Sequence, residues 1–280
     1  MVRLAFSTNA FKKNTLDEAI GVIGDIGYSG VELMADLHHA YPPAMDANRL
    51  AHTKKYLADR KLPVSNVNAF TLFACGDTYH PTWIESDPEK RQQRIDHTLN
   101  CIDLASEFGA RTISLQPGGP LIGRNLSRDD AADLFAEGIT QVLPRAKEKN
   151  LILAIEPEPG LFIENAAEYL EFKNRFFKNE SAVQMNCDLG HLFCVGDDPA
   201  DVLRTHADHI AHVHLEDIGK NRVHQHLTPG KGVIDFPEIF RALDEIHYDG
   251  WVTVELYPYE TTAAGVAQAA WEHLKPIAKI

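Results

Sequence analysis

The chain has 280 residues, 44% of them hydrophobic, and this length and composition predict one domain with one large core. Its 27 basic and 40 acidic residues give a formal net charge of -13, which argues against nucleic acid as a partner. The amino-terminal residues contain no apolar run long enough for a signal peptide or a membrane span, and the four cysteines show no CxxC spacing. We therefore expect a cytoplasmic location with no membrane contact, and the sequence leaves open whether the protein is a homo-oligomer.

Short β-branched or apolar runs alternate with longer helical patterns eight times along the chain. The predicted strands cover residues 2–6, 30–34, 62–68, 111–116, 151–156, 182–188, 209–215 and 251–256. The predicted helices cover residues 16–26, 49–60, 88–108, 128–149, 165–177, 199–206, 237–247 and 261–278. Because consecutive parallel strands need a right-handed helical crossover, these units predict an α/β fold, the (β/α)8 TIM barrel, formed by residues 1–280 as a single domain.

A doubly wound open sheet is the competing fold for such an alternation of strands and helices. That fold is expected to carry a glycine-rich phosphate turn after its first strand. The residues found at this position, Ser7, Thr8 and Asn9, contain no glycine. The sequence therefore favours the closed barrel.

The longest irregular stretch covers residues 69–87, after the third predicted strand, and it is rich in aromatic residues. These are Phe70, Phe73, Tyr79 and Trp83. Loops of this length in compact domains are commonly functional lids or disordered segments. We expect either a packed lid over the rim of the barrel or a hydrophobic cluster beside the core.

Four polar residues lie at the ends of four successive apolar runs, within the last two residues of predicted strands in the second half of the chain. They are Glu156, Asp188, His214 and Glu255. The residue before each is apolar, so alternation along a strand directs the four polar side chains into the barrel and the apolar ones towards the outer helices. Catalytic groups converge at the carboxyl-terminal rim of such barrels. Three carboxylates and one imidazole suit a divalent ion such as Mn, Mg, Zn or Co, so we predict a metal site.

Five short segments contain these four residues or follow them in the chain. The segments are IEPEPG (155–160), NCDLGH (186–191), HVHLED (212–217), HLTPGKGVIDF (226–236) and GWVTVELY (250–257). Together they resemble the last four strands of the xylose isomerase-like TIM barrel superfamily, which includes sugar isomerases and epimerases, dehydratases and apurinic-site endonucleases. The resemblance implies the fold and the metal site. It does not imply the substrate, because one scaffold hosts several chemistries.

In the sugar epimerase branch, the resemblance implies that the four strand-end residues hold one divalent ion. This ion stabilises the enediolate that forms when a carbon beside a carbonyl loses its proton, while Glu156 and Glu255 act as base and acid. His191 would contact a substrate hydroxyl, and Glu158 or Arg222 would position the distal end of the substrate. The leading hypothesis is a metal-dependent isomerase or epimerase of a small polyhydroxylated carbonyl compound such as a sugar, sugar phosphate or cyclitol. A dehydratase using the same enolate chemistry is an alternative.

The endonuclease branch implies another role for three histidines. There, an Asp-x-His pair and a histidine after the sixth strand bind an additional ion, and the matching residues are His224, His226 and His191. Two other endonuclease ligands appear here as Asn68 and Gln116, so the full three-metal site is missing. The histidines either bind a second ion, which favours a two-metal phosphoester hydrolase, or contact substrate. We favour substrate contact, because three neutral histidines bring no carboxylate to balance an ion.

Overall fold

Eight parallel strands form a closed barrel in the computed structural model, which describes residues 2–280. Each strand pairs with the next one along the chain, and β8 closes the barrel against β1. The strands are β1 (Arg3–Ser7), β2 (Gly30–Met34), β3 (Val64–Asn68), β4 (Thr112–Leu115), β5 (Ile152–Ile155), β6 (Val183–Asp188), β7 (Ile210–Leu215) and β8 (Trp251–Val254). The predicted TIM barrel is confirmed, and the open-sheet alternative is wrong.

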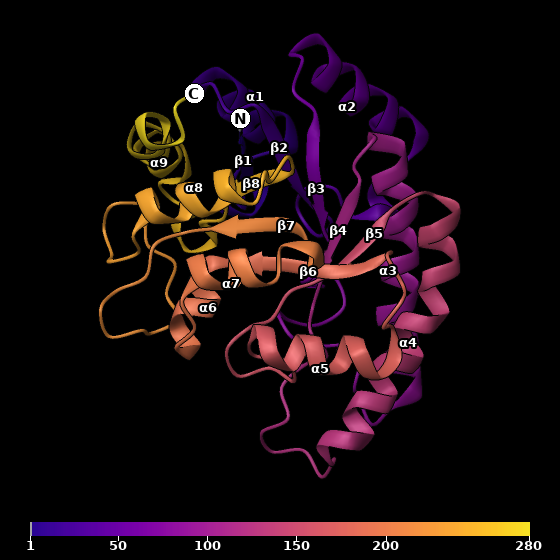
Figure 1. The fold of residues 1–280 in the computed structure, drawn as a ribbon. Helices are drawn as coiled ribbons and strands as arrows, with labels where there is room; N and C mark the ends of the chain where they lie inside the picture. Colours follow the sequence, from indigo (N-terminus) through magenta and orange to yellow (C-terminus); the bar gives the residue numbers. More distant parts are fainter. Residues whose placement is uncertain (1) are drawn as a thin grey trace.

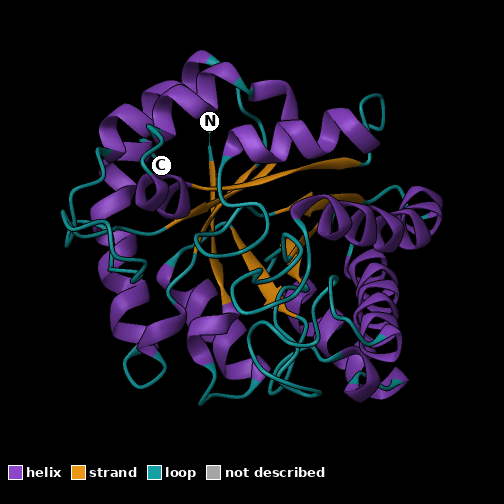
Figure 2. Cartoon of the chain, turned by 90° about the horizontal axis from the view of Figure 1, so that it is seen from below, coloured by secondary structure: helices purple, strands orange, loops and turns teal. Residues whose placement is uncertain are grey.

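Nine α-helices lie around the strands within residues 2–280, as the two views in Figure 1 and Figure 2 show. They are α1 (Leu16–Ile26), α2 (Ala47–Asp59), α3 (Pro88–Phe108), α4 (Arg128–Glu148), α5 (Ala166–Phe176), α6 (Leu189–Val195), α7 (Pro199–Thr205), α8 (Phe236–Glu245) and α9 (Ala263–Ala278). Eight of them were predicted, with ends that differ by no more than two residues. The sequence analysis missed α6, because its seven residues are too few for a periodic pattern.

Side-chain caps explain where several helices begin. Thr15 and Glu18 form a reciprocal capping box at the start of α1, in which each side chain accepts from the other residue's backbone N–H. Ser127 accepts from the N–H of Asp130 at the start of α4. Asp188 does the same for α6 by accepting from the N–H of His191 at 2.8 Å. The last cap joins the end of β6 to the next helix and so fixes two predicted site residues relative to each other.

Polar side chains fill much of the barrel interior, beyond the four predicted from the strand ends. Asn66 donates to Glu32 at 2.8 Å and to Ser114 at 2.9 Å, and all three side chains are fully buried. These hydrogen bonds offset the cost of removing polar groups from water. The residues that precede the four polar strand ends belong instead to the continuous apolar core, namely Ile155, Cys187, Val213 and Val254. The alternation predicted from the sequence is therefore present.

Part of the long loop after β3 packs against the core. Trp83 is buried and packs on Phe135 of α4, with ring centroids 5.7 Å apart. The buried guanidinium of Arg94 in α3 donates to the carbonyl oxygens of Ala69, Phe70 and Pro81, at 2.8 to 3.0 Å. Arg94 thus ties the start of the loop and its later part at Pro81 to one helix.

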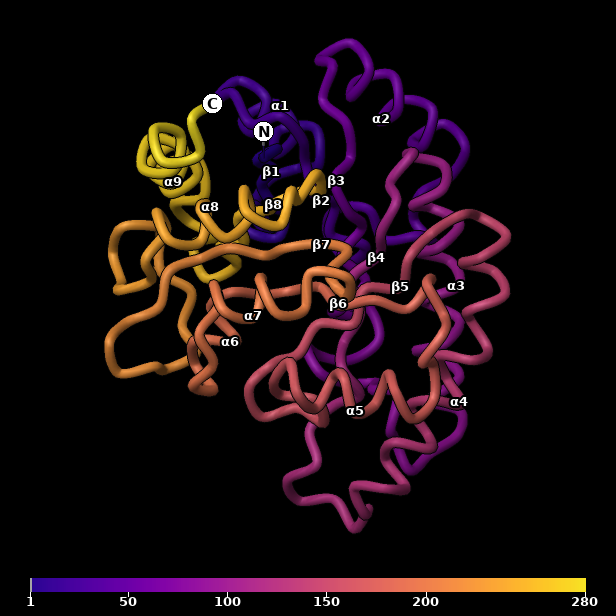
Figure 3. The backbone as a smooth tube through the Cα atoms, viewed as in Figure 1, coloured from indigo at the N-terminus to yellow at the C-terminus, as the bar shows by residue number. Residues whose placement is uncertain are grey.

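The two ends of the chain lie on the same side of the barrel, as the tube in Figure 3 shows. Helix α9 packs beside α1, and the Tyr28 hydroxyl donates to the carbonyl oxygen of Ala267 at 3.0 Å. No helix among residues 2–280 combines the length and the low polarity that a membrane crossing requires.

Candidate metal centre

The four predicted ligands meet where β5, β6, β7 and β8 end. Each of Glu156, Asp188, His214 and Glu255 offers one ligand atom, and these atoms all lie within 4.8 Å of one another. All four side chains are buried. Residues that are up to 99 positions apart in the sequence therefore form one compact group of three carboxylates and one imidazole, and this N/O donor set suits a divalent cation.

The imidazole of His214 is at the centre of this group. Its Nδ1 atom lies 3.1 Å from Glu156 Oε1, 3.8 Å from Glu255 Oε1 and 3.9 Å from Asp188 Oδ2. Although burial lowers the pKa of His214, the surrounding carboxylates raise it well above its usual range. A cation bound here would displace that proton, so its affinity should rise with pH.

Asp188 gives the clearest sign that these residues fit an ion. Its Oδ1 atom accepts the capping bond from the N–H of His191, whereas its Oδ2 atom is buried and has no hydrogen-bond partner within residues 2–280. An unsatisfied buried carboxylate oxygen is costly unless a cation or a proton compensates it. Nearby, burial raises the pKa of Glu156 and, more strongly, that of Glu255. The three carboxylates of the group therefore have too few positive charges near them, and a bound cation would stabilise them.

Glu32, which the sequence analysis missed, orients the central histidine. Its Oε2 atom lies 2.7 Å from Nε2 of His214, and both side chains are fully buried. With Nε2–H donating to Glu32, the lone pair of Nδ1 faces the other three ligands. The signal in the sequence was a single carboxylate in the middle of the otherwise apolar strand β2.

We expect Glu32→Gln to weaken metal affinity by about 10- to 100-fold, the usual effect of losing a partner that orients a ligand. The amide keeps the volume of the side chain but loses the charge that stabilises the Nε2–H tautomer of His214. Titration with a chromophoric chelator as competitor measures the change. Glu89→Gln, on the exposed surface of α3, is the matched control and should leave affinity unchanged. Equal affinity in both variants would show that Glu32 has no part in orienting His214.

Three histidine rings converge beside the first group. His226 Nε2 lies 3.2 Å from Nε2 of His224 and 3.4 Å from Nε2 of His191. The Nδ1 atoms of His191 and His226 face the carbonyl oxygens of Pro157 and Glu255 at 3.1 and 2.9 Å. Burial lowers the pKa of His191 well below its usual range and that of His226 to about 3, so both rings are neutral at pH 7. Their Nε2 lone pairs can therefore accept a hydrogen bond or bind a cation.

Glu216 was also not predicted from the sequence, and its carboxylate bears on whether a second ion can bind. It is fully buried, neither carboxylate oxygen has a hydrogen-bond partner within residues 2–280, and it groups with Asp188 and His226 within 4.8 Å. Burial raises its pKa well above the usual range. A Cβ atom at Gly190 would lie 1.6 Å from Glu216 Oε1, so only glycine admits the carboxylate here. The three histidines thus do have a carboxylate beside them.

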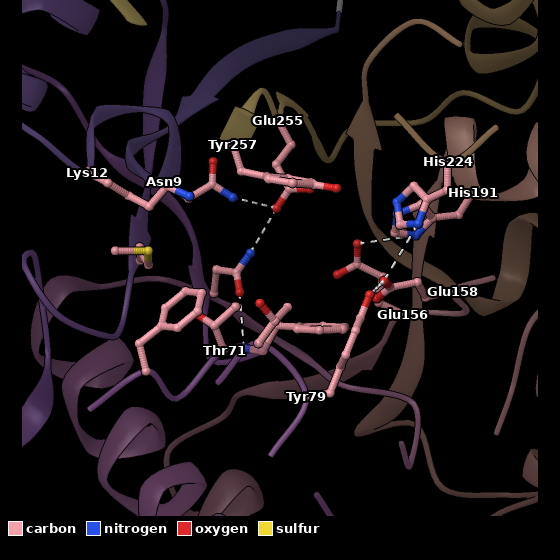
Figure 4. A pocket seen from close by; sticks show the side chains of 15 residues that line it. Asn9, Lys12, Thr71, Tyr79, Glu156, Glu158, His191, His224, Glu255 and Tyr257 are labelled. Atoms are coloured by element: carbon pink, nitrogen blue, oxygen red, sulfur yellow. Dashed lines mark hydrogen bonds and ion pairs between the residues drawn. The ribbon is translucent and has the colours of Figure 1, made fainter. Parts of the chain in front are cut away.

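A cavity of about 250 Å³ opens over both groups. In Figure 4, Glu156, Glu158, His191 and His224 lie on one side of it, and Asn9 and Lys12 lie on the other. The carboxylate of Glu158 accepts from the Tyr79 hydroxyl at 3.1 Å, and burial raises its pKa well above the usual range. Because Glu158 lines the cavity, a substrate bound there could reach it, as predicted from the sequence. Phe70, Phe73 and Tyr79 of the long loop line the cavity, as a lid would.

Three other residues discussed in the sequence analysis are not among the candidate ion ligands. Arg222 is exposed, donates to the carbonyl oxygen of Phe193 at 2.9 Å and is not among the described residues that line the cavity, so its predicted substrate contact is not supported. Asn68 donates to Glu255 at 3.1 Å, and Gln116 donates to the carbonyl oxygen of Tyr79 at 3.0 Å. Both amides position parts of the site.

Comparisons with known proteins agree with this architecture. A family model described as xylose isomerase-like TIM barrel matches residues 21–277. Inosose dehydratase of Clostridium beijerinckii is 27% identical over 270 residues, which cover 87% of this chain and 83% of that protein. The solved structure of IolI protein with a binding zinc atom has a TM-score of 0.80 at 16% identity and covers 99% of this chain and 98% of its own. That of 3-keto-D-glucoside 4-epimerase, YcjR, from E. coli has a TM-score of 0.75 at 19% identity, with 95% and 99% covered.

Proposed function

The chain belongs to the xylose isomerase-like TIM barrel family, and from this premise we propose that it is a divalent-metal-dependent isomerase or epimerase. Its substrate is a small polyhydroxylated carbonyl compound, such as a sugar, sugar phosphate or cyclitol. One observation carries the proposal: Glu156 and Glu255 both line the cavity and both belong to the group that can hold a cation. Solved relatives described as an epimerase and as a zinc-binding protein support it.

Different residues of the chain would have different roles in such a reaction. An ion held by the four ligands would act as a Lewis acid that stabilises negative charge on the substrate oxygens. Glu156 follows β5 and Glu255 follows β8, so the two carboxylates approach the cavity from different strands (Figure 4). One removes a proton from the carbon beside the carbonyl, and the other returns a proton to that carbon or its neighbour. His191 also lines the cavity, and in a protein that holds one ion its Nε2 atom would be free to hydrogen-bond a substrate hydroxyl.

A dehydratase is the second candidate, and two observations favour it. The curated relatives are described as inosose dehydratases, and Glu158 places a third carboxyl group in the cavity. Elimination of water needs a group that protonates the departing hydroxyl, in addition to the base that removes the proton from carbon. Glu158, which accepts from Tyr79, is the residue available for this step.

Product analysis tests the proposal and separates the two candidates. The protein, loaded in turn with Mn, Mg, Zn or Co, is incubated with ketopentoses, ketohexoses, their phosphates and inososes, and the products are identified by carbon NMR. We expect an isomer or epimer that retains all its oxygen atoms. A product that has lost water would establish the dehydratase instead. If no compound reacts with any of the four metals, the proposal is wrong.

We further propose that His191, His224 and His226 hold a second ion, which would displace the proton of the buried Glu216 and gain a negative charge beside it. Reconstituted protein should then hold two ions per chain by elemental analysis. Replacing His224 and His226 together by alanine should leave one ion, because the four strand-end ligands are untouched. One ion in both proteins would assign the histidines to substrate contact instead. Two ions together with hydrolysis of bis(p-nitrophenyl) phosphate would favour the phosphoester hydrolase over the isomerase.

A further inference from the structure

Lys12 is the single lysine or arginine among the described residues that line the cavity. It directly follows the short turn η1 (Thr8–Phe11), at the end of β1. Figure 4 shows it beside Asn9, across the cavity from Glu158 and His224. Its ammonium group is therefore available to the end of a ligand that lies away from the histidines.

No acidic partner neutralises Lys12. No carboxylate oxygen among residues 2–280 lies within 4.0 Å of its Nζ atom, although the chain carries 40 acidic residues. The next residue, Lys13, does have such a partner, Glu260 at 3.2 Å. The described aromatic contact of Lys12 is with the ring of Tyr257, whose centroid lies 5.8 Å from Nζ. The side chain is half-buried, so part of its hydration is already lost.

Lys12 shares the lining of the cavity with the neutral side chains of Asn9, Met34, Phe70 and Tyr257, and the amide of Asn9 donates to the Glu255 carboxylate at 2.8 Å. The carboxylates of the cavity belong to the metal centre or, in the case of Glu158, bond to Tyr79. The ammonium group of Lys12, which has no acidic partner, would attract a negatively charged end of an elongated ligand more strongly than a neutral end.

We propose that Lys12 binds an anionic group, a phosphate or a carboxylate, at the end of the substrate farthest from the reacting carbon. The inference rests on the proposed function, and it narrows the substrate class to sugar phosphates or sugar acids. The acidic chain as a whole repels anions, so this recognition depends on a local charge. A charge-assisted hydrogen bond from Lys12 would then select the anionic compound over its neutral counterpart.

Calorimetric titration of the metal-loaded protein with three non-reacting ligands tests this inference. Xylitol is the neutral probe, xylitol 5-phosphate the phosphate probe and xylonate the carboxylate probe. We expect at least one anionic probe to bind about 10- to 100-fold more tightly than xylitol, as expected for a hydrogen bond to a charged group. Lys12→Met should remove this preference, and Lys12→Arg should keep most of it. Lys13→Met is the matched control and should bind all three ligands as the wild type does.

The outcomes separate this inference from the proposed function. If xylitol binds and neither anion binds more tightly, or if the preference survives in Lys12→Met, the role of Lys12 is wrong and the sugar-binding function stands. If only anions bind, in a Lys12-dependent manner, the anion site is supported and the polyhydroxyl specificity fails. If none of the three binds, both are overturned. A preference for phosphate alone or for carboxylate alone identifies the class of substrate.

Discussion

Replacing Asp188 with alanine is expected to abolish activity and the binding of a metal ion by the four-ligand group. Asp188 belongs to the four-ligand group and is the one carboxylate that β6 contributes to it. Even partners that only orient metal ligands are worth about 10- to 100-fold in affinity, so losing a ligand should cost more than about 100-fold. Elemental analysis after dialysis against a defined metal concentration measures the loss. Full metal stoichiometry in this variant would mean that the metal centre is wrongly assigned.

Two further variants separate the loss of the ligand from the loss of the helix cap. Asp188→Asn keeps an oxygen that can accept from the N–H of His191 but removes the charge, so it should fold normally and still lose most of its metal affinity. Asp198→Ala removes a cap of the same kind from α7, outside the site, where Asp198 accepts from Ala200 and Asp201. It should cost about 1 kcal/mol of stability and leave metal binding unchanged.

Strand periodicity explains why most of the site could be predicted. Polar residues that follow apolar ones at strand ends must face the barrel, and parallel strands bring their carboxyl ends together. This argument needs no knowledge of distances, and it led to Glu156, Asp188, His214 and Glu255, which the structure brings together. The same two-residue spacing continues from His214 to Glu216. Glu216 could therefore have been predicted in the same way, but the predicted strand ended at Leu215 and Glu216 was assigned to the loop that follows it.

Other parts of the site depend on contacts that no local pattern encodes. Glu32 meets His214 across the barrel, 182 residues away in the sequence, and only the closed geometry brings them together. Arg222 shows the reverse case. Its loop follows β7 closely enough to suggest a role in the site, but a positive φ of 56° and the bond to Phe193 turn the chain so that the guanidinium stays outside the cavity. Loop paths of this kind depend on individual backbone conformations.

Glutamine at Glu156 or Glu255 is expected to lower the turnover number by about 100- to 10,000-fold, the range typical of a lost general acid or base. The amide keeps an oxygen near the metal centre but cannot carry a proton to or from carbon. Metal content measured at saturating ion concentration shows whether the loss arises from the chemistry or from an empty centre. Glu171→Gln, on the exposed face of α5, is the control and should retain full activity.

Deuterium exchange shows which face of the substrate each carboxylate serves. In deuterated water, the wild type should incorporate deuterium at the carbon beside the carbonyl. If Glu156 and Glu255 serve opposite faces, each glutamine variant should still exchange the hydrogen of one epimer, because the remaining carboxylate can remove and return a proton on its own face. Neither variant should invert that carbon. Exchange of the same epimer by both variants would mean that Glu156 and Glu255 lie on the same face of the substrate. Absence of exchange during wild-type turnover would count against proton transfer through carboxylates that exchange with solvent.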